Sequence, residues 1–251
     1  MKKHKIEWTE ATWNPSAGCS KVSSGCKNCY AEAMAIRLKA MNVVGYKNGF
    51  EFNTVPSRIN DPLKKKKPTV FFVNSMSDIF HEKMPIEYLD RIFKVIEQTP
   101  YHTYQVLTKR AERMFEYLSK REIPKNIWLG VTVENKKEGL PRIEKLRNLK
   151  ASVLFLSVEP LLEDLEKINL KNIDWVIVGG ESGNRARPMS KDWILNIQRQ
   201  CESEDIAFFF KQWGTWGADQ KKRNKKLNGK KINGKIYQEY PEIIEQQYAT
   251  V

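Results

Sequence analysis

The chain has 251 residues, of which 41% are hydrophobic, and its formal net charge at pH 7 is +13. This length and composition predict one large globular α/β domain and exclude an intrinsically disordered chain. No apolar run is long enough to span a bilayer, and no apolar signal region follows the basic stretch Met1–Lys5. We therefore expect a cytoplasmic protein with reduced cysteines and no membrane partner.

Positive charge is concentrated in two lysine-rich blocks, Lys64–Lys67 and the segment between Lys221 and Lys231. Clustered cations favour contacts with phosphates, although such runs also occur as ordinary solvated surface. We expect a nucleotide or nucleic acid as partner, and a plain solvated surface is the alternative.

The first predicted strand, Ile6–Trp13, ends at Asn14-Pro15 and leads into a loop that holds three of the four cysteines. A helix is predicted from Cys29, because apolar residues then recur at helical spacing. The residues at that spacing are Tyr30, Met34, Leu38 and Met41. Residues 42–67 indicate an irregular insertion rich in Gly, Asn and Pro.

From residue 70 onward, short continuous apolar runs alternate with amphipathic helical patterns. The predicted strands are 70–73, 104–107, 127–131, 153–156, 175–178 and 206–210. Apolar strands that alternate with helices are typical of a parallel sheet covered by helices. With the first strand they predict a partial (β/α) barrel of about six or seven parallel strands over residues 1–216. A basic C-terminal extension, 217–251, follows and carries an Asn-Gly hairpin signal at Asn233-Gly234.

The cysteine loop predicts a metal centre. Cys19, Cys26 and Cys29 have the spacing C-x6-C-x2-C, and three thiolates suit a [4Fe-4S] cluster with one iron left open for a substrate or cofactor. A zinc site with a distant fourth ligand, such as His81 or His102, and thiols with no shared role are the alternatives. Cys201 is in phase with the apolar face of its predicted helix, so we interpret it as a core thiol.

Polar and charged side chains follow almost every predicted strand. The carboxyl ends of parallel strands share one rim, where α/β enzymes place their active sites. Because the cysteine loop also follows a strand, we expect it on the same rim, and this convergence indicates an enzyme. The pair Gly179-Gly180 does not fit the dinucleotide fingerprint. Trp213 and Trp216 are interpreted as packing residues, with base stacking as the alternative.

Six motifs together resemble an uncharacterised family of phage and prophage proteins assigned to the radical S-adenosylmethionine-like clan. They cover about residues 8–216 and are WNP…C-x6-C-x2-C-Y from Trp13, NSMSDIF from Asn74, LGVTVE from Leu129, LSVEP from Leu156, GGES from Gly179 and FKQWG from Phe210. The resemblance implies a radical-SAM-like partial barrel with the cluster loop after the first strand. The usual spacing in that superfamily is C-x3-C-x2-C, and the first gap here is longer.

The resemblance also implies a mechanism, in which Cys19, Cys26 and Cys29 hold three irons of a [4Fe-4S] cluster and S-adenosylmethionine binds the fourth. An electron from an external donor then cleaves the cofactor to a 5′-deoxyadenosyl radical, which abstracts hydrogen from the substrate. The residues we assign to cofactor binding are Ser75, Ser77 and Asp78 for the methionyl amine, and Glu134 and Glu159 for the ribose or carboxylate side. Those we assign to the substrate side are Glu181 and Lys211 as catalytic groups, with Arg185, Arg187 and Gln212 as binding groups.

Three functions remain open on the sequence. The first is a radical S-adenosylmethionine enzyme acting on a nucleotide or nucleic acid. The second is a nucleic-acid-binding protein in which zinc or an iron–sulfur cluster is structural and no radical forms. The third is an enzyme of the same fold that uses the cluster for repair or electron transfer. The substrate is not specified by any of these residues.

Overall fold

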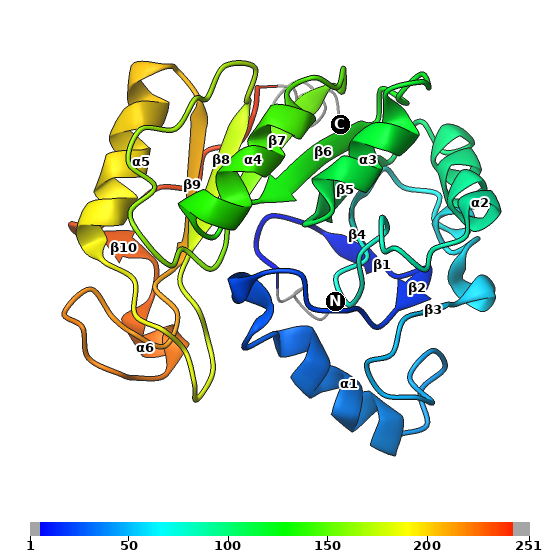
Figure 1. Ribbon diagram of the computed structural model, residues 1–251, viewed down its shortest axis with the longest axis horizontal. Coiled ribbons are helices and arrows are strands. Elements are labelled where there is room, and N and C mark those ends of the chain that lie inside the picture. Colours follow the sequence, from blue (N-terminus) through cyan, green and yellow to red (C-terminus); the bar gives the residue numbers. More distant parts are fainter. Residues whose placement is uncertain (1–5, 243–251) are drawn as a thin grey trace. The chain divides into compact units, whose positions relative to one another are not determined.

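The computed structural model describes residues 6–242, so the basic start of the chain lies outside the described residues. The chain divides into two compact units. Unit 1 comprises residues 1–130 and 148–152, and unit 2 comprises residues 131–147 and 153–251. Figure 1 colours the chain by residue number.

A seven-stranded sheet carries the fold, with the strand order β1-β4-β5-β6-β7-β8-β9 (Figure 1). Its strands are β1 Ala11–Trp13, β4 Val70–Val73, β5 Thr103–Thr108, β6 Ile127–Thr132, β7 Val153–Val158, β8 Trp175–Gly179 and β9 Ala207–Gln212. They run parallel, with Phe71 of β4 opposite Tyr104 of β5 and Leu156 of β7 opposite Val176 of β8. The predicted α/β partial barrel of seven parallel strands is therefore confirmed.

Unit 1 contains three α-helices, which are α1 Tyr30–Ala40, α2 Ile86–Glu97 and α3 Ala111–Leu118. Of these, α2 and α3 bury a face of large apolar residues. Helix α2 buries Leu89, Ile92 and Ile96 completely, as the 3.6-residue period requires. A two-strand antiparallel pair, β2 Ser16–Ala17 with β3 Asn53–Thr54, and the 3₁₀ turns Ser24–Cys26, Pro56–Arg58 and Pro62–Lys64 complete this unit.

Unit 2 contains α4 Lys136–Leu146, α5 Lys191–Ser203 and the short helix α6 Lys225–Asn228. Helix α5 packs along β9 (Figure 1) and buries Cys201 completely, which confirms that this cysteine is a core thiol. Residues 159–174 connect β7 to β8 without a helix.

The tail of the chain packs onto unit 2. The predicted hairpin forms from β10 Lys231–Ile232 and β11 Lys235–Ile236, with Asn233 and Gly234 at positive φ in its turn. Beyond it, the amide of Phe210 donates to the carbonyl of Tyr237 at 2.8 Å. The tail thus adds hydrogen bonds to the free side of β9.

Two local predictions differ from the structure. The first strand covers only Ala11–Trp13, because Trp8 instead packs edge-on against Phe72 with ring centroids 4.7 Å apart. Helix α1 forms as predicted, but its buried side consists of alanines, while Tyr30 and Met41 are 60% and 70% exposed. Among residues 6–242 no helix combines the length and the apolar character that crossing a membrane requires.

Candidate functional site

The cysteine loop is held at its start by Gly18. The amide of Gly18 donates to the carbonyl of Met76 at 3.2 Å, and the amide of Cys19 donates to that of Phe50 at 3.0 Å. A Cβ at Gly18 would lie 2.1 Å from the carbonyl oxygen of Glu51, and its φ is +75°. Only glycine permits both this approach and this backbone conformation.

The loop after β4 is fastened to the cysteine loop. The Asn14 side-chain oxygen accepts hydrogen bonds from the Ser75 hydroxyl and the Met76 amide, both at 3.2 Å. The Ser77 hydroxyl donates to the Gly18 carbonyl at 2.7 Å, and the Tyr30 hydroxyl donates to the Ser75 carbonyl at 2.5 Å. Unit 1 therefore brings two of the predicted cofactor residues against the cysteine loop.

Cys19, Cys26 and Cys29 are all partly buried free thiols. Burial raises the pKa of Cys19 to about 11, and Asp78 and Cys26 act in the same direction. Within residues 6–242, no three His, Cys, Asp or Glu side chains are gathered closely enough to hold a metal ion. The donor chemistry still fits the predicted cluster, because three thiols on one loop are the ligands such a cluster takes.

The two histidines considered as zinc ligands are engaged elsewhere. His81 stacks on Phe52 at 4.1 Å, its Nδ1 accepts from the Lys83 amide, and its Nε2 lies 3.0 Å from the Ser20 hydroxyl. His102 is 1% exposed, and its Nε2 lies 3.2 Å from the Pro62 carbonyl. These contacts disfavour both side chains as a fourth ligand.

Asp78 organises the ends of β4 and β5. Its carboxylate accepts from the Thr108 hydroxyl at 2.7 Å, from the Lys109 amide at 3.2 Å and from Arg110 Nη1 at 3.0 Å. Burial disfavours the charge of Arg110, but Asp78 and Cys19 outweigh it and raise the pKa of the guanidinium. Asp78 therefore shares Arg110 with Cys19 of the cysteine loop, and its oxygens are already engaged by the protein.

In unit 2, Glu159 and Lys211 link the ends of β7 and β9. Lys211 Nζ donates to Glu159 Oε2 at 2.6 Å. Glu159 Oε1 is buried and has no hydrogen-bond partner within residues 6–242. It packs against Gly179, where a Cβ would lie 3.2 Å from this oxygen. The sequence predicted both residues for the site, and the structure brings them into direct contact.

Glu181 and Arg187 form a second pair in unit 2. Arg187 Nη2 donates to Glu181 Oε1 at 2.5 Å, and Arg187 Nε donates to Oε2 at 3.0 Å. The hydrogen bond to Glu181 and its charge raise the pKa of Arg187. A bidentate pair of this kind holds the loop after β8 in one conformation.

The glycines of this loop allow a close backbone crossing. A Cβ at Gly180 would lie 2.0 Å from the carbonyl of Trp213, and one at Gly214 would lie 2.2 Å from that of Glu181. The GGES and FKQWG motifs therefore interlock. Trp213 is 2% exposed and donates to the Lys231 carbonyl at 2.9 Å, which supports a packing role.

The remaining predicted residues of unit 2 differ in exposure. Glu134 is completely buried, and Arg142 Nη1 donates to its Oε2 at 2.5 Å. Gln212 donates to the Ser182 hydroxyl at 3.0 Å, whereas Arg185 is exposed. Sequence reasoning missed Arg142 and Arg110 as partners of these carboxylates. Arg110 follows the predicted strand 104–107 by three residues, which is the signal that would have found it.

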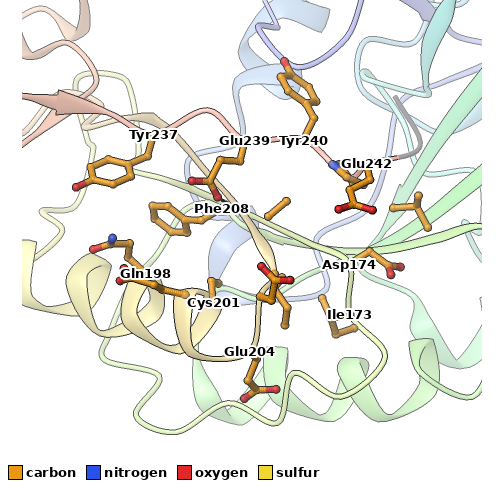
Figure 2. Close-up of a pocket in the computed structure, with 16 residues that line it drawn as sticks. Ile173, Asp174, Gln198, Cys201, Glu204, Phe208, Tyr237, Glu239, Tyr240 and Glu242 are labelled. Carbon is orange, nitrogen blue, oxygen red and sulfur yellow. Dashed lines mark hydrogen bonds between the residues drawn. The ribbon is translucent and has the colours of Figure 1, made fainter. Parts of the chain in front are cut away.

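A cavity of about 720 Å³ lies elsewhere in unit 2, at the amino ends of β7, β8 and β9. Figure 2 shows Phe208, Tyr237 and Glu239 around it, together with Cys201 and Asp174. The cavity therefore lies away from Glu159, Glu181 and Lys211, which are at the carboxyl ends of these strands.

A family model described as "Protein of unknown function (DUF5131)" matches residues 3–241. No curated protein sequence matches the chain. A structure of spore photoproduct lyase complexed with dinucleoside spore photoproduct is similar at a TM-score of 0.48 and 14% identity, over 79% of this chain and 62% of the lyase. A variant of that lyase gives 0.46 and 15%, over 72% and 58%. The chain thus spans less than two thirds of the length of these proteins.

Proposed function

The chain belongs to the DUF5131 family, and from its own residues we propose that it is a radical S-adenosylmethionine enzyme with a [4Fe-4S] cluster on Cys19, Cys26 and Cys29. The observation that carries this proposal is the fastening of the thiol loop to the β4 loop. In this contact the Ser77 hydroxyl donates a hydrogen bond to the Gly18 carbonyl at 2.7 Å, and the Ser75 hydroxyl donates one to the Asn14 side-chain oxygen. A three-thiol donor set thus adjoins hydroxyl groups suited to an amino acid moiety.

In this proposal the chain's residues bind and orient. Ser75, Ser77 and Asp78 lie on the side of the methionyl amine, and the carboxylate of Asp78 also keeps Arg110 in place. When bound, a reduced cluster supplies the electron that cleaves S-adenosylmethionine. An external electron donor is then required as a partner.

The unit 2 residues are proposed to serve the remainder of the cofactor and the substrate. Glu134 and Glu159 are assigned to the cofactor, and Glu181 with Lys211 to catalysis. Arg185, Arg187 and Gln212 are assigned to substrate binding. Guanidinium groups suit phosphate or carboxylate groups, and the net charge of +13 favours a nucleotide or nucleic acid as substrate.

Anaerobic reconstitution with iron and sulfide tests the cluster. The wild-type protein should bind roughly four iron and four sulfide ions and absorb near about 400 nm. Each of the variants Cys19→Ser, Cys26→Ser and Cys29→Ser should lose most of the bound iron. Cys201→Ala should retain it, because Cys201 is buried on helix α5. Wild-type protein without iron, or full iron in all three serine variants, would contradict the proposal.

A product assay separates radical catalysis from other uses of a cluster. With dithionite and S-adenosylmethionine, the loaded protein should release 5′-deoxyadenosine, and the Cys26→Ser variant should not. A loaded protein that releases none would favour repair or electron transfer.

The second candidate is a nucleic-acid-binding protein with a structural metal. The exposed block Lys64–Lys67 and the exposed lysines between Lys221 and Lys226 favour it. One bound zinc ion, no colour and salt-dependent binding to a single-stranded oligonucleotide would support this candidate. Glutamine at Lys64–Lys67 should then weaken the binding and reduce its salt dependence.

A further inference from the structure

Arg110 is a buried guanidinium that contacts a cysteine of the loop. Its Nη1 lies 3.5 Å from Cys19 Sγ and 3.0 Å from Asp78 Oδ2. The side chains of Arg110 and Asp78 are each only 8% exposed. An N–H group of a cation that points at sulfur donates a charge-assisted hydrogen bond to it.

Three further contacts fix the orientation of this guanidinium. Nε donates to Glu82 Oε2 at 2.9 Å, and Nη2 donates to the Ser20 carbonyl and hydroxyl at 3.1 Å and 2.8 Å. The Arg110 amide also donates to the Thr108 hydroxyl at 2.9 Å. Rotation away from Cys19 would leave the buried charge of Asp78 without its cation, which is costly. The contact with sulfur is therefore held in place by the rest of the network.

We propose that Arg110 raises the reduction potential of the [4Fe-4S] cluster by donating a hydrogen bond to the sulfur of Cys19. This inference rests on the proposed function. Reduction adds one electron, supplied by a low-potential chemical reductant, and it breaks no bond and moves no proton. A donor at a ligating sulfur stabilises the more negative, reduced form, and hydrogen bonds to sulfur are among the factors that set such potentials. Arg110 is thus a positioning and tuning residue rather than a ligand.

The test compares Arg110→Met and Arg110→Lys with the wild-type protein after reconstitution. The matched control is Arg113→Met, because Arg113 braces the same region through the carbonyls of His81 and Met84. At a fixed applied potential, the ratio of reduced to oxidised cluster should fall in Arg110→Met, because hydrogen bonds to the sulfurs help to set the potential. Arg110→Lys should fall in between, and Arg113→Met should match the wild type.

A measurement on the wild-type protein avoids dependence on any variant. With 15N-arginine in the chain, electron–nuclear double resonance of the reduced cluster should show coupling to a guanidinium nitrogen. A wild-type protein that takes up no cluster overturns the proposed function and this inference together. A loaded protein without nitrogen coupling, or with equal ratios in both Arg110 variants and the wild type, overturns this inference alone. The labelled protein decides the matter even if both variants fail to fold.

Discussion

Lys211 donates to Glu159 Oε2 at 2.6 Å, while Oε1 of the same carboxylate is buried with no hydrogen-bond partner within residues 6–242. The two side chains are 22% and 17% exposed. Lys211→Met therefore leaves a mostly buried charge with no cation, and we expect the free energy of unfolding to fall by about 2 kcal/mol, between the values for exposed and buried pairs. Urea unfolding of the metal-free protein measures this change.

The converse variant supplies the control. Glu159→Gln leaves the Lys211 ammonium as the unpaired ion, but this side chain is the more exposed of the two and its flexible stem can carry the charge to water, so the cost should be smaller. Glu159→Gln with Lys211→Met should recover part of the loss. Equal costs for the two single variants, with no recovery in the double variant, would show that the contact does not couple the two side chains.

Replacing Gly18 with alanine should destabilise the cysteine loop by more than the positive φ of Gly18 alone would predict. Gly18 and Gly49 have similar positive φ values, +75° and +71°, but a Cβ at Gly49 meets only Lys39 Cδ at 3.9 Å, against 2.1 Å to a carbonyl oxygen at Gly18. Alanine at either position incurs left-handed strain of about 1–2 kcal/mol. Gly18→Ala should add the steric clash to this cost and also lower the iron bound on reconstitution.

Gly49→Ala is the matched control for that experiment. It should lose stability through strain but retain the wild-type iron content. If both alanine variants show the same melting temperature and the same iron content, the approach of Gly18 to Glu51 is not what positions the loop.

Most of the strands were predictable because they contain a short run of apolar residues. Val70–Val73 and Trp175–Gly179 are buried along their whole length, so a simple run of apolar letters marks them. The first strand was harder, because Trp8 and Thr9 are buried without belonging to the ladder. Burial by side-chain packing and burial within a sheet give the same sequence signal.

The sequence showed which strand ends carry the site carboxylates, but it did not show which cation pairs with each carboxylate. Position after a strand marks Asp78, Glu159 and Glu181 equally. Only the structure shows that each carboxylate is paired with a cation, and that Arg187 is a partner of Glu181. Pairing depends on side-chain direction in a loop, which no periodicity encodes.

Arg185 and Arg187 should therefore behave differently, although both were predicted to bind substrate. Arg187→Lys loses the bidentate hydrogen bond with Glu181, so it should lower the free energy of unfolding by about 1–2 kcal/mol. Arg185 is exposed, so Arg185→Ala should change the free energy of unfolding by less than about 0.5 kcal/mol. Binding of a phosphate-bearing oligonucleotide should instead weaken in Arg185→Ala. Chemical unfolding together with a binding titration of both variants checks this, and equal stability losses would contradict it.

His81 should make the protein sensitive to mild acid. Burial, and then the charge of Arg110, lower its pKa from 6.5 to about 4. The folded protein thus favours the neutral ring, so this stabilising contribution is complete above pH 6.5 and is lost as the pH falls from 6.5 to about 4. The loss amounts to at most about 3 kcal/mol, from the difference between the two pKa values. His81→Gln has no such group, so its unfolding free energy should fall less steeply over this range, and parallel curves for the two proteins in urea unfolding at several pH values would contradict the prediction.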